Sequence, residues 1–120
     1  MIQFSIRAAL IVATIFSTAR LASAQAVISE FLADNRSGLT DSDGDESDWI
    51  EIRNDSGSVL NLDGWSLTDL PDDLSRWVFP SITVPAGGYL VVFASGKDRR
   101  DPASELHTNF GLNNNGEYLA

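Results

Sequence analysis

The feature that most constrains this chain is a series of short apolar runs between residues 49 and 96. Turn-forming Asp, Ser, Gly or Pro residues separate each run from the next. Each run also carries an aromatic residue, which suits a strand that is buried on one face. The pattern therefore predicts an all-β domain with the architecture of a β-sandwich.

Side-chain alternation assigns a buried face to several of these runs. Ile50 and Ile52 share one side of a strand, because neighbouring side chains in a strand point to opposite faces. Residues 89–95 are apolar at every position except the last, which predicts a central strand covered on both faces. Strands are predicted at residues 26–32, 49–54, 65–68, 77–79, 89–95, 106–110 and 117–120, with a hairpin turn at 113–116.

The first 24 residues have the features of a targeting segment. Arg7 supplies a positive charge, residues 8–16 form a short apolar run, and Ala22-Ser23-Ala24 is a small-residue cleavage pattern. We predict a signal peptide over residues 1–24, and hence a secreted or cell-surface protein. An uncleaved anchor or a buried N-terminal helix are the alternatives. The run is shorter than the roughly 20 residues that a membrane span needs, so no membrane association is expected after cleavage.

The predicted mature domain, residues 25–120, is strongly acidic. The whole chain has a net charge of −9, and loss of Arg7 and Arg20 with the signal peptide makes it −11. Such a charge repels phosphate backbones and argues against binding to nucleic acid. The chain has no Cys, which excludes disulfides, thiol catalysis and thiolate metal sites. A domain of this size must then be held together by packing of its aromatic and aliphatic side chains.

The long polar segment at residues 33–48 holds the one cluster that suggests chemistry. Asp41, Asp43 and Asp45 alternate along a predicted loop, and carboxylate oxygens so spaced can surround a calcium ion. The segment misses the EF-hand pattern, which counted from Asp41 requires Gly where Glu46 stands and Glu where Ile52 stands. These three residues are the metal candidates, with a solvated acidic loop as the alternative. No other cofactor is expected.

No catalytic residue is predicted. His107 is the single histidine, and because the sequence has no G-x-S-x-G motif we interpret it as a surface or packing residue. Trp65 and Trp77 each have an apolar partner two positions away, which predicts that both belong to the core. A carbohydrate-stacking platform of tryptophans is the alternative, and Trp49 is left open.

Several motifs in this order resemble the lamin tail domain family. They are W-I-E-I-R-N at 49–54, L-D-G-W-S-L at 62–67, R-W-V-F-P at 76–80 and P-A-G-G followed by an apolar strand at 85–96. Residues 95–102 and 105–110 are similar to the secreted bacterial branch of the family. The resemblance implies an immunoglobulin-like β-sandwich and no shared catalytic residues. The chain has neither a heptad rod nor a basic nuclear-import run, so a filament role does not carry over.

The resulting expectation is a domain at residues 25–120 that is C-terminally incomplete, since seven strands are reached only by counting the short run at 117–120. We expect a non-enzymatic interaction or spacer module of a larger secreted or cell-surface protein, with an unknown protein or cell-envelope partner. The alternatives are an accessory domain of an extracellular hydrolase, such as a nuclease or phosphatase, and a calcium-stabilised adhesive module.

Overall fold

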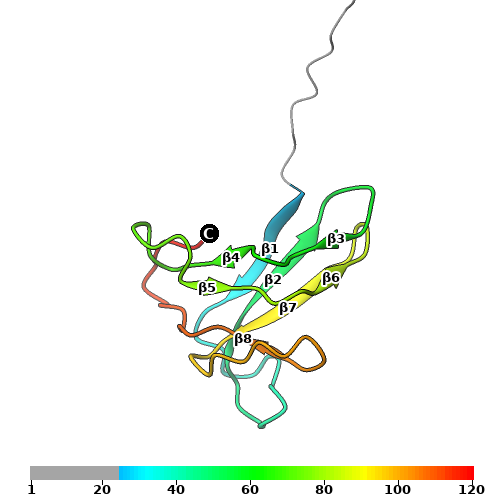
Figure 1. Cartoon of the computed structure of the whole chain (residues 1–120). Helices are drawn as coiled ribbons and strands as arrows, with labels where there is room; N and C mark the ends of the chain where they lie inside the picture. The colour runs from blue at the N-terminus through cyan, green and yellow to red at the C-terminus, as the bar shows by residue number, and fades with distance from the viewer. Residues whose placement is uncertain (1–24) are drawn as a thin grey trace, which may run out of the picture.

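The computed structural model describes residues 25–120, and the predicted signal peptide lies outside the described residues. The described part is all-β, as predicted, and contains no helix that could cross a membrane. Its strands form three sheets (Figure 1). They are β1 (Ala26–Leu32), β2 (Asp48–Asn54), β3 (Leu60–Asn61), β4 (Ser66–Leu67), β5 (Trp77–Val78), β6 (Thr83–Val84), β7 (Tyr89–Ala94) and β8 (Leu106–His107).

The largest sheet has the strand order β1-β2-β7-β8. The pairs β1–β2 and β2–β7 are antiparallel, whereas β8 pairs with β7 in parallel. The predicted central strand is thus β7, between β2 and β8. Its coverage is uneven, because Tyr89 is 58% exposed while Val92, Phe93 and Ala94 are buried. The prediction that both faces are covered therefore holds only for the second half of the strand.

The opposing layer consists of two short antiparallel pairs, β3–β6 and β4–β5. They form one interrupted ribbon, since the Leu62 amide donates to Ile82 and the Phe79 amide donates to Trp65 between them. The interruption falls at a tight turn in which Gly64 has φ of 78° and the Trp65 amide donates to Leu62. Glycine adopts this left-handed conformation without steric cost.

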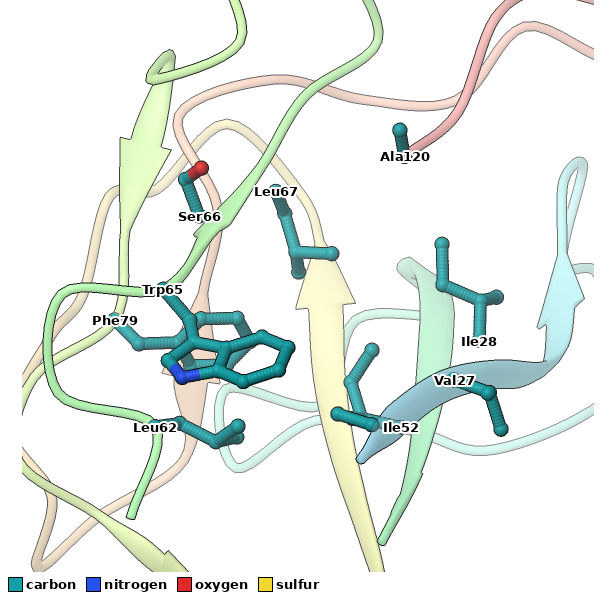
Figure 2. Close-up of a pocket in the computed structure, with 10 residues that line it drawn as sticks. Val27, Ile28, Ile52, Leu62, Trp65, Ser66, Leu67, Phe79 and Ala120 are labelled. Carbon is teal, nitrogen blue, oxygen red and sulfur yellow. The ribbon is translucent and has the colours of Figure 1, made fainter. Parts of the chain in front are cut away.

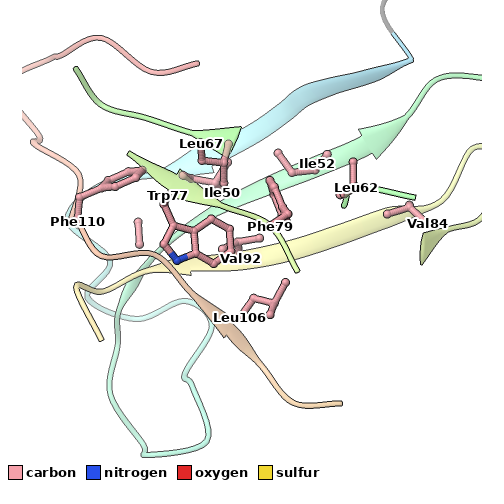
Figure 3. Close-up of a cluster of buried hydrophobic side chains, with 11 residues drawn as sticks. Ile50, Ile52, Leu62, Leu67, Trp77, Phe79, Val84, Val92, Leu106 and Phe110 are labelled. Atoms are coloured by element: carbon pink, nitrogen blue, oxygen red, sulfur yellow. The ribbon is translucent and has the colours of Figure 1, made fainter. Parts of the chain in front are cut away.

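The hydrophobic core lies between the two layers (Figure 3). Ile50 and Ile52 from β2 face Trp77, which is fully buried and lies edge-on to Phe79 with ring centroids 4.9 Å apart. These are the inward-facing side chains that alternation predicted. Each fully buried side chain of this size contributes about 1.5–3 kcal/mol through removal of apolar surface from water. The remaining members of the cluster are Leu62, Leu67, Val84, Val92, Ala94, Leu106 and Phe110.

Two predictions about the strands are wrong. Leu60 and Asn61 form β3 although no strand was predicted there. Residues 117–120 do not form the second arm of a hairpin. The turn exists, with the Gly116 amide donating to Asn113, but Ala120 then pairs with Thr68, the residue after β4. Residues 106–110 do not serve as the hairpin's first arm, because β8 pairs with β7 on one edge and with Arg99 on the other.

Candidate functional site

Asp41 organises the acidic loop that precedes β2. Its Oδ1 accepts hydrogen bonds from the amides of Asp43 and Asp45, each at 3.0 Å, and its Oδ2 accepts one from Ser47 Oγ at 3.0 Å. The amides of Asp41 and Gly44 close the same turn through backbone bonds. The structure thereby gathers the carboxylates of Asp41, Asp43 and Asp45, with one oxygen of each within 4.8 Å of the others.

A lysine from a distant loop lies in the middle of this cluster. Nζ of Lys97 donates to Oδ2 of Asp41 at 2.6 Å, to Oδ2 of Asp43 at 2.8 Å and to Oδ2 of Asp45 at 2.8 Å. Arg99 adds a second cation, 2.6 Å from Asp43. Calcium would require the same oxygens at 2.3–2.6 Å. The ammonium group therefore takes the position that an ion would need, and calcium binding stays a prediction in competition with Lys97.

The pKa values in the cluster reflect this pairing. Burial acts to raise the pKa of Asp41, but the bonds from Lys97, the Asp45 backbone and Ser47 outweigh it and hold that pKa well below its usual range. Bonds from Arg99 and then Lys97 lower the pKa of Asp43. The bond to Asp41, followed by those to Asp43 and Asp45, raises the pKa of Lys97. Asp41, Asp43 and Lys97 therefore remain charged at neutral pH.

His107 lies beneath this cluster and is fully buried. Its ring stacks on Phe93 at 5.3 Å, and Nδ1 lies 2.8 Å from Oγ of Ser95. Its Nε2 has no hydrogen-bond partner among the described residues, and Oε1 of Glu105 is 3.9 Å away. Burial, together with the nearby Arg99 and Lys97, lowers the pKa of His107. The structure therefore places His107 in the interior, packed against Phe93, and not on the surface.

An apolar groove lies between the start of β1 and β4 (Figure 2). Its volume is about 200 Å³, and Val27, Ile28, Ile52 and Leu67 contribute to its walls. Trp65 stands at its rim and is 40% exposed. The prediction that Trp65 belongs to the core is therefore wrong. Alternation places its side chain on the inner face correctly, but no further described strand covers the edge of β4 at this position.

The tryptophan left open by the sequence is half-buried. Nε1 of Trp49 is enclosed and finds no acceptor among residues 25–120. By contrast, Nε1 of the fully buried Trp77 donates to Asp98 at 3.1 Å. The three tryptophans thus occupy different environments and do not share a face as a stacking platform would require.

Lys97 and Arg99, the cations of this cluster, were not predicted from the sequence. A usable signal was the matched spacing, D-x-D-x-D at 41–45 against K-x-R at 97–99. Glu105 adds a further tie, since its Oε1 accepts from the Ser42 amide at 2.7 Å. These contacts fix the acidic loop to the loop before β8 and explain why a long polar segment has a defined shape.

Comparison with protein families gives one match, to the family described as the Lamin Tail Domain, over residues 20–120. Comparisons with curated proteins and with solved structures gave no match. The matched region contains all the described strands, the acidic loop and the groove. The two layers and the absence of helix among residues 25–120 are consistent with the immunoglobulin-like fold of that family. The chain therefore belongs to the lamin tail domain family.

Proposed function

We propose that residues 25–120 act as a non-catalytic recognition module of a larger exported protein, and that the groove between β1 and β4 is the recognition surface. The observation that carries this proposal is an apolar hollow with a partly exposed tryptophan at its rim. Tryptophan is one of the residue types that most often dominate binding energy at interfaces.

The placement of the reactive side chains supports the non-catalytic part of the proposal. Ser95 is the only described hydroxyl bonded to the imidazole of His107, and that imidazole is fully buried. Neither residue lines the groove. The three carboxylates of the acidic cluster are paired with Lys97 and Arg99, and these ion pairs hold two loops together.

A calcium-stabilised adhesive module is the second candidate, since three carboxylates do converge. It requires the Lys97 ammonium to leave the cluster, and three short hydrogen bonds oppose this. The recognition module requires no such rearrangement, and for that reason we favour it.

Hydrolase assays test the absence of catalysis. The purified chain is expected to give no turnover of general nuclease, phosphatase and esterase substrates. Ser95→Ala is the matched variant, because Ser95 carries the one hydroxyl beside the imidazole. Turnover by the wild-type chain that disappears in Ser95→Ala would contradict the proposal.

Export is tested separately, because it rests on residues 1–24 alone. Expression of the full chain in a bacterial host is expected to yield an exported product that begins at Gln25. A product that remains at full length in the cytosol would show that the apolar segment is not a cleaved signal.

A further inference from the structure

We infer that Gln25, the first residue of the predicted mature chain, cyclises to an N-terminal pyroglutamate, and that this neutral lactam protects β1 from aminopeptidases. The inference rests on the proposed function, because cleavage of the exported chain after Ala24 is the step that frees the α-amine of Gln25. Gln25 is also the only glutamine in residues 25–120. The single side chain able to form this lactam thus stands at the one position where it can form.

The reaction needs no group beyond those of Gln25 itself. The α-amino nitrogen attacks Cδ of the side-chain amide, and a bond forms between this nitrogen and Cδ. The bond from Cδ to Nε2 then breaks, and Nε2 leaves as ammonia with one proton from the amine. Attack within a five-membered ring benefits from a high effective concentration of the amine. An α-amine has an ordinary pKa of about 8, so a fraction of it is unprotonated and nucleophilic at neutral pH.

The fold accommodates the modified residue. Gln25 is exposed and lies directly before β1, so its side chain has the freedom to turn back toward its own backbone. The carbonyl of Gln25 accepts a hydrogen bond from the Asp55 amide at 2.9 Å. Cyclisation involves only the α-nitrogen and the side chain, and therefore leaves this carbonyl and its bond unchanged. The lactam can stand at the end of the β1–β2 pair without a change in the strands.

The short distance between Gln25 and β1 gives the lactam its protective role. β1 begins at the very next residue, Ala26, which lies opposite Asn54 in the ladder and packs against the core. Removal of two residues from the mature N-terminus would therefore break the first pair of the β1–β2 ladder. Chain ends are where proteolysis concentrates. Aminopeptidases act on a free α-amine, and the lactam has none because cyclisation converts that amine to an uncharged amide.

Mass and N-terminal sequence of the exported product test the modification. The full chain is expressed in a bacterial host and the exported product is purified. We expect a product of residues 25–120 that is lighter by one ammonia than the unmodified polypeptide and that gives no N-terminal sequence. Treatment with a pyroglutamyl aminopeptidase should remove the blocked residue and make the sequence readable from Ala26. A product with a free amine at Gln25 would overturn the inference and leave export intact.

Gln25→Asn is the matched control. It keeps the side-chain amide but is one methylene shorter, so attack by the α-amine would have to close a strained four-membered ring. Its exported product should have the unmodified mass and a readable sequence from residue 25. Loss of ammonia that persists in this variant would place the modification elsewhere in the chain and overturn the inference. A product that keeps residues 1–24 would instead remove the predicted signal peptide, and the inference with it.

Aminopeptidase digestion tests the protective role separately. The wild-type product should keep its full mass, whereas Gln25→Asn should lose at least its first residue under the same conditions. The wild-type product opened by pyroglutamyl aminopeptidase begins at Ala26 and should also be trimmed. Trimming past Ala26 should lower the melting temperature, because Ala26 packs against the core. Equal resistance of the blocked and unblocked products would overturn the protective role, even if the lactam is found.

Discussion

Nζ of Lys97 lies 2.6 Å from Oδ2 of Asp41, although 56 positions separate the two residues in the sequence. The Asp41 side chain is completely buried, whereas that of Lys97 is 22% exposed. A buried carboxylate is stable only if it is paired and hydrogen-bonded. This contact therefore joins the loop before β2 to the loop after β7, and the acidic cluster depends on it.

Lys97→Ala is expected to lower the melting temperature clearly, because it leaves the buried carboxylate of Asp41 without a cation. The control is Arg36→Ala, which breaks the ion pair with Asp34 at a surface where the arginine side chain is 79% exposed. Exposed pairs contribute little. Thermal unfolding monitored by circular dichroism measures both variants. Equal melting temperatures for the two would show that Lys97 is not required.

Calcium provides a second measurement on the same residue. Millimolar calcium should leave the melting temperature of the wild-type chain unchanged, because the ammonium of Lys97 already contacts all three carboxylates. In Lys97→Ala the three oxygens remain close together and only Arg99, on Asp43, still pairs with them, so added calcium should recover part of the lost stability. A calcium effect as large in the wild type as in the variant would contradict this account.

Acidification should destabilise the domain in two stages, of which His107 is the first. Burial lowers the folded-state pKa of His107 below its ordinary value of 6.5. Below about pH 6.5 the unfolded chain binds a proton at His107 that the folded chain does not. The contribution of His107 to the free energy of unfolding is therefore fully present above about pH 6.5 and falls as the pH drops toward the folded pKa. Denaturant unfolding at about pH 7.5 and about pH 5 should show this loss in the wild type. His107→Phe should show little change between the two conditions.

The second stage comes from Asp41, Asp43 and Glu105, whose pKa values are lowered in the folded state. Their contribution is present above the ordinary carboxyl pKa of about 4 and is lost as the pH falls through the folded values. The His107→Phe variant should keep this stage. Disappearance of both stages in the variant would mean that the two groups of residues do not titrate independently.

Asn54→Ala should cost about 3 kcal/mol of unfolding free energy, because a buried polar hub is removed. Nδ2 of Asn54 donates to the carbonyls of Ser58, Val84 and Pro85 at 2.7–3.1 Å, and Oδ1 accepts from Ser56. Asn115→Ala, at an exposed turn, is the control and should change the free energy by less than about 0.5 kcal/mol. Urea denaturation gives both values. A small cost for Asn54→Ala would show that water can replace its bonds.

The sequence has two Asn-x-Ser glycosylation patterns, Asn35-Arg36-Ser37 and Asn54-Asp55-Ser56. Asn54 and Asn35 are both buried, and Nδ2 of Asn35 donates to Leu39 and Ser47. A glycan on either nitrogen would displace these bonds. Neither pattern therefore marks an accessible modification site in the folded domain.

Trp77→Ala and Trp65→Ala should differ in cost. Trp77 is fully buried at the centre of the core, and its loss should cost about 3–5 kcal/mol. Trp65 is 40% exposed at the groove, and its loss should cost about 1–2 kcal/mol. Urea denaturation compares them, with Trp77→Phe as a milder variant if Trp77→Ala does not fold. Equal costs would indicate that the groove is closed in solution.

The alternation of apolar and polar side chains determined where most of the longer strands lie and which face of each strand is buried. Ile50, Ile52, Trp77 and Phe79 are buried where the period of two predicted, because the direction of a side chain depends only on its own short strand. The close spacing of Asp41, Asp43 and Asp45 is local in the same sense, since backbone bonds within a few residues gather their carboxylates.

Only the tertiary structure decided which distant groups meet. The sequence does not predict that Lys97 pairs with the acidic loop or that β8 runs parallel to β7. Nor does it predict that Ala120 pairs with Thr68 beside β4 in place of a hairpin. Each of these depends on which long loop closes against which surface, and the entropic cost of closure varies only slowly with loop length. Packing and charge therefore decide which distant segments contact each other, and these contacts form only when the two layers have come together. For the same reason Trp65 has the sequence pattern of a core residue but forms the rim of a groove.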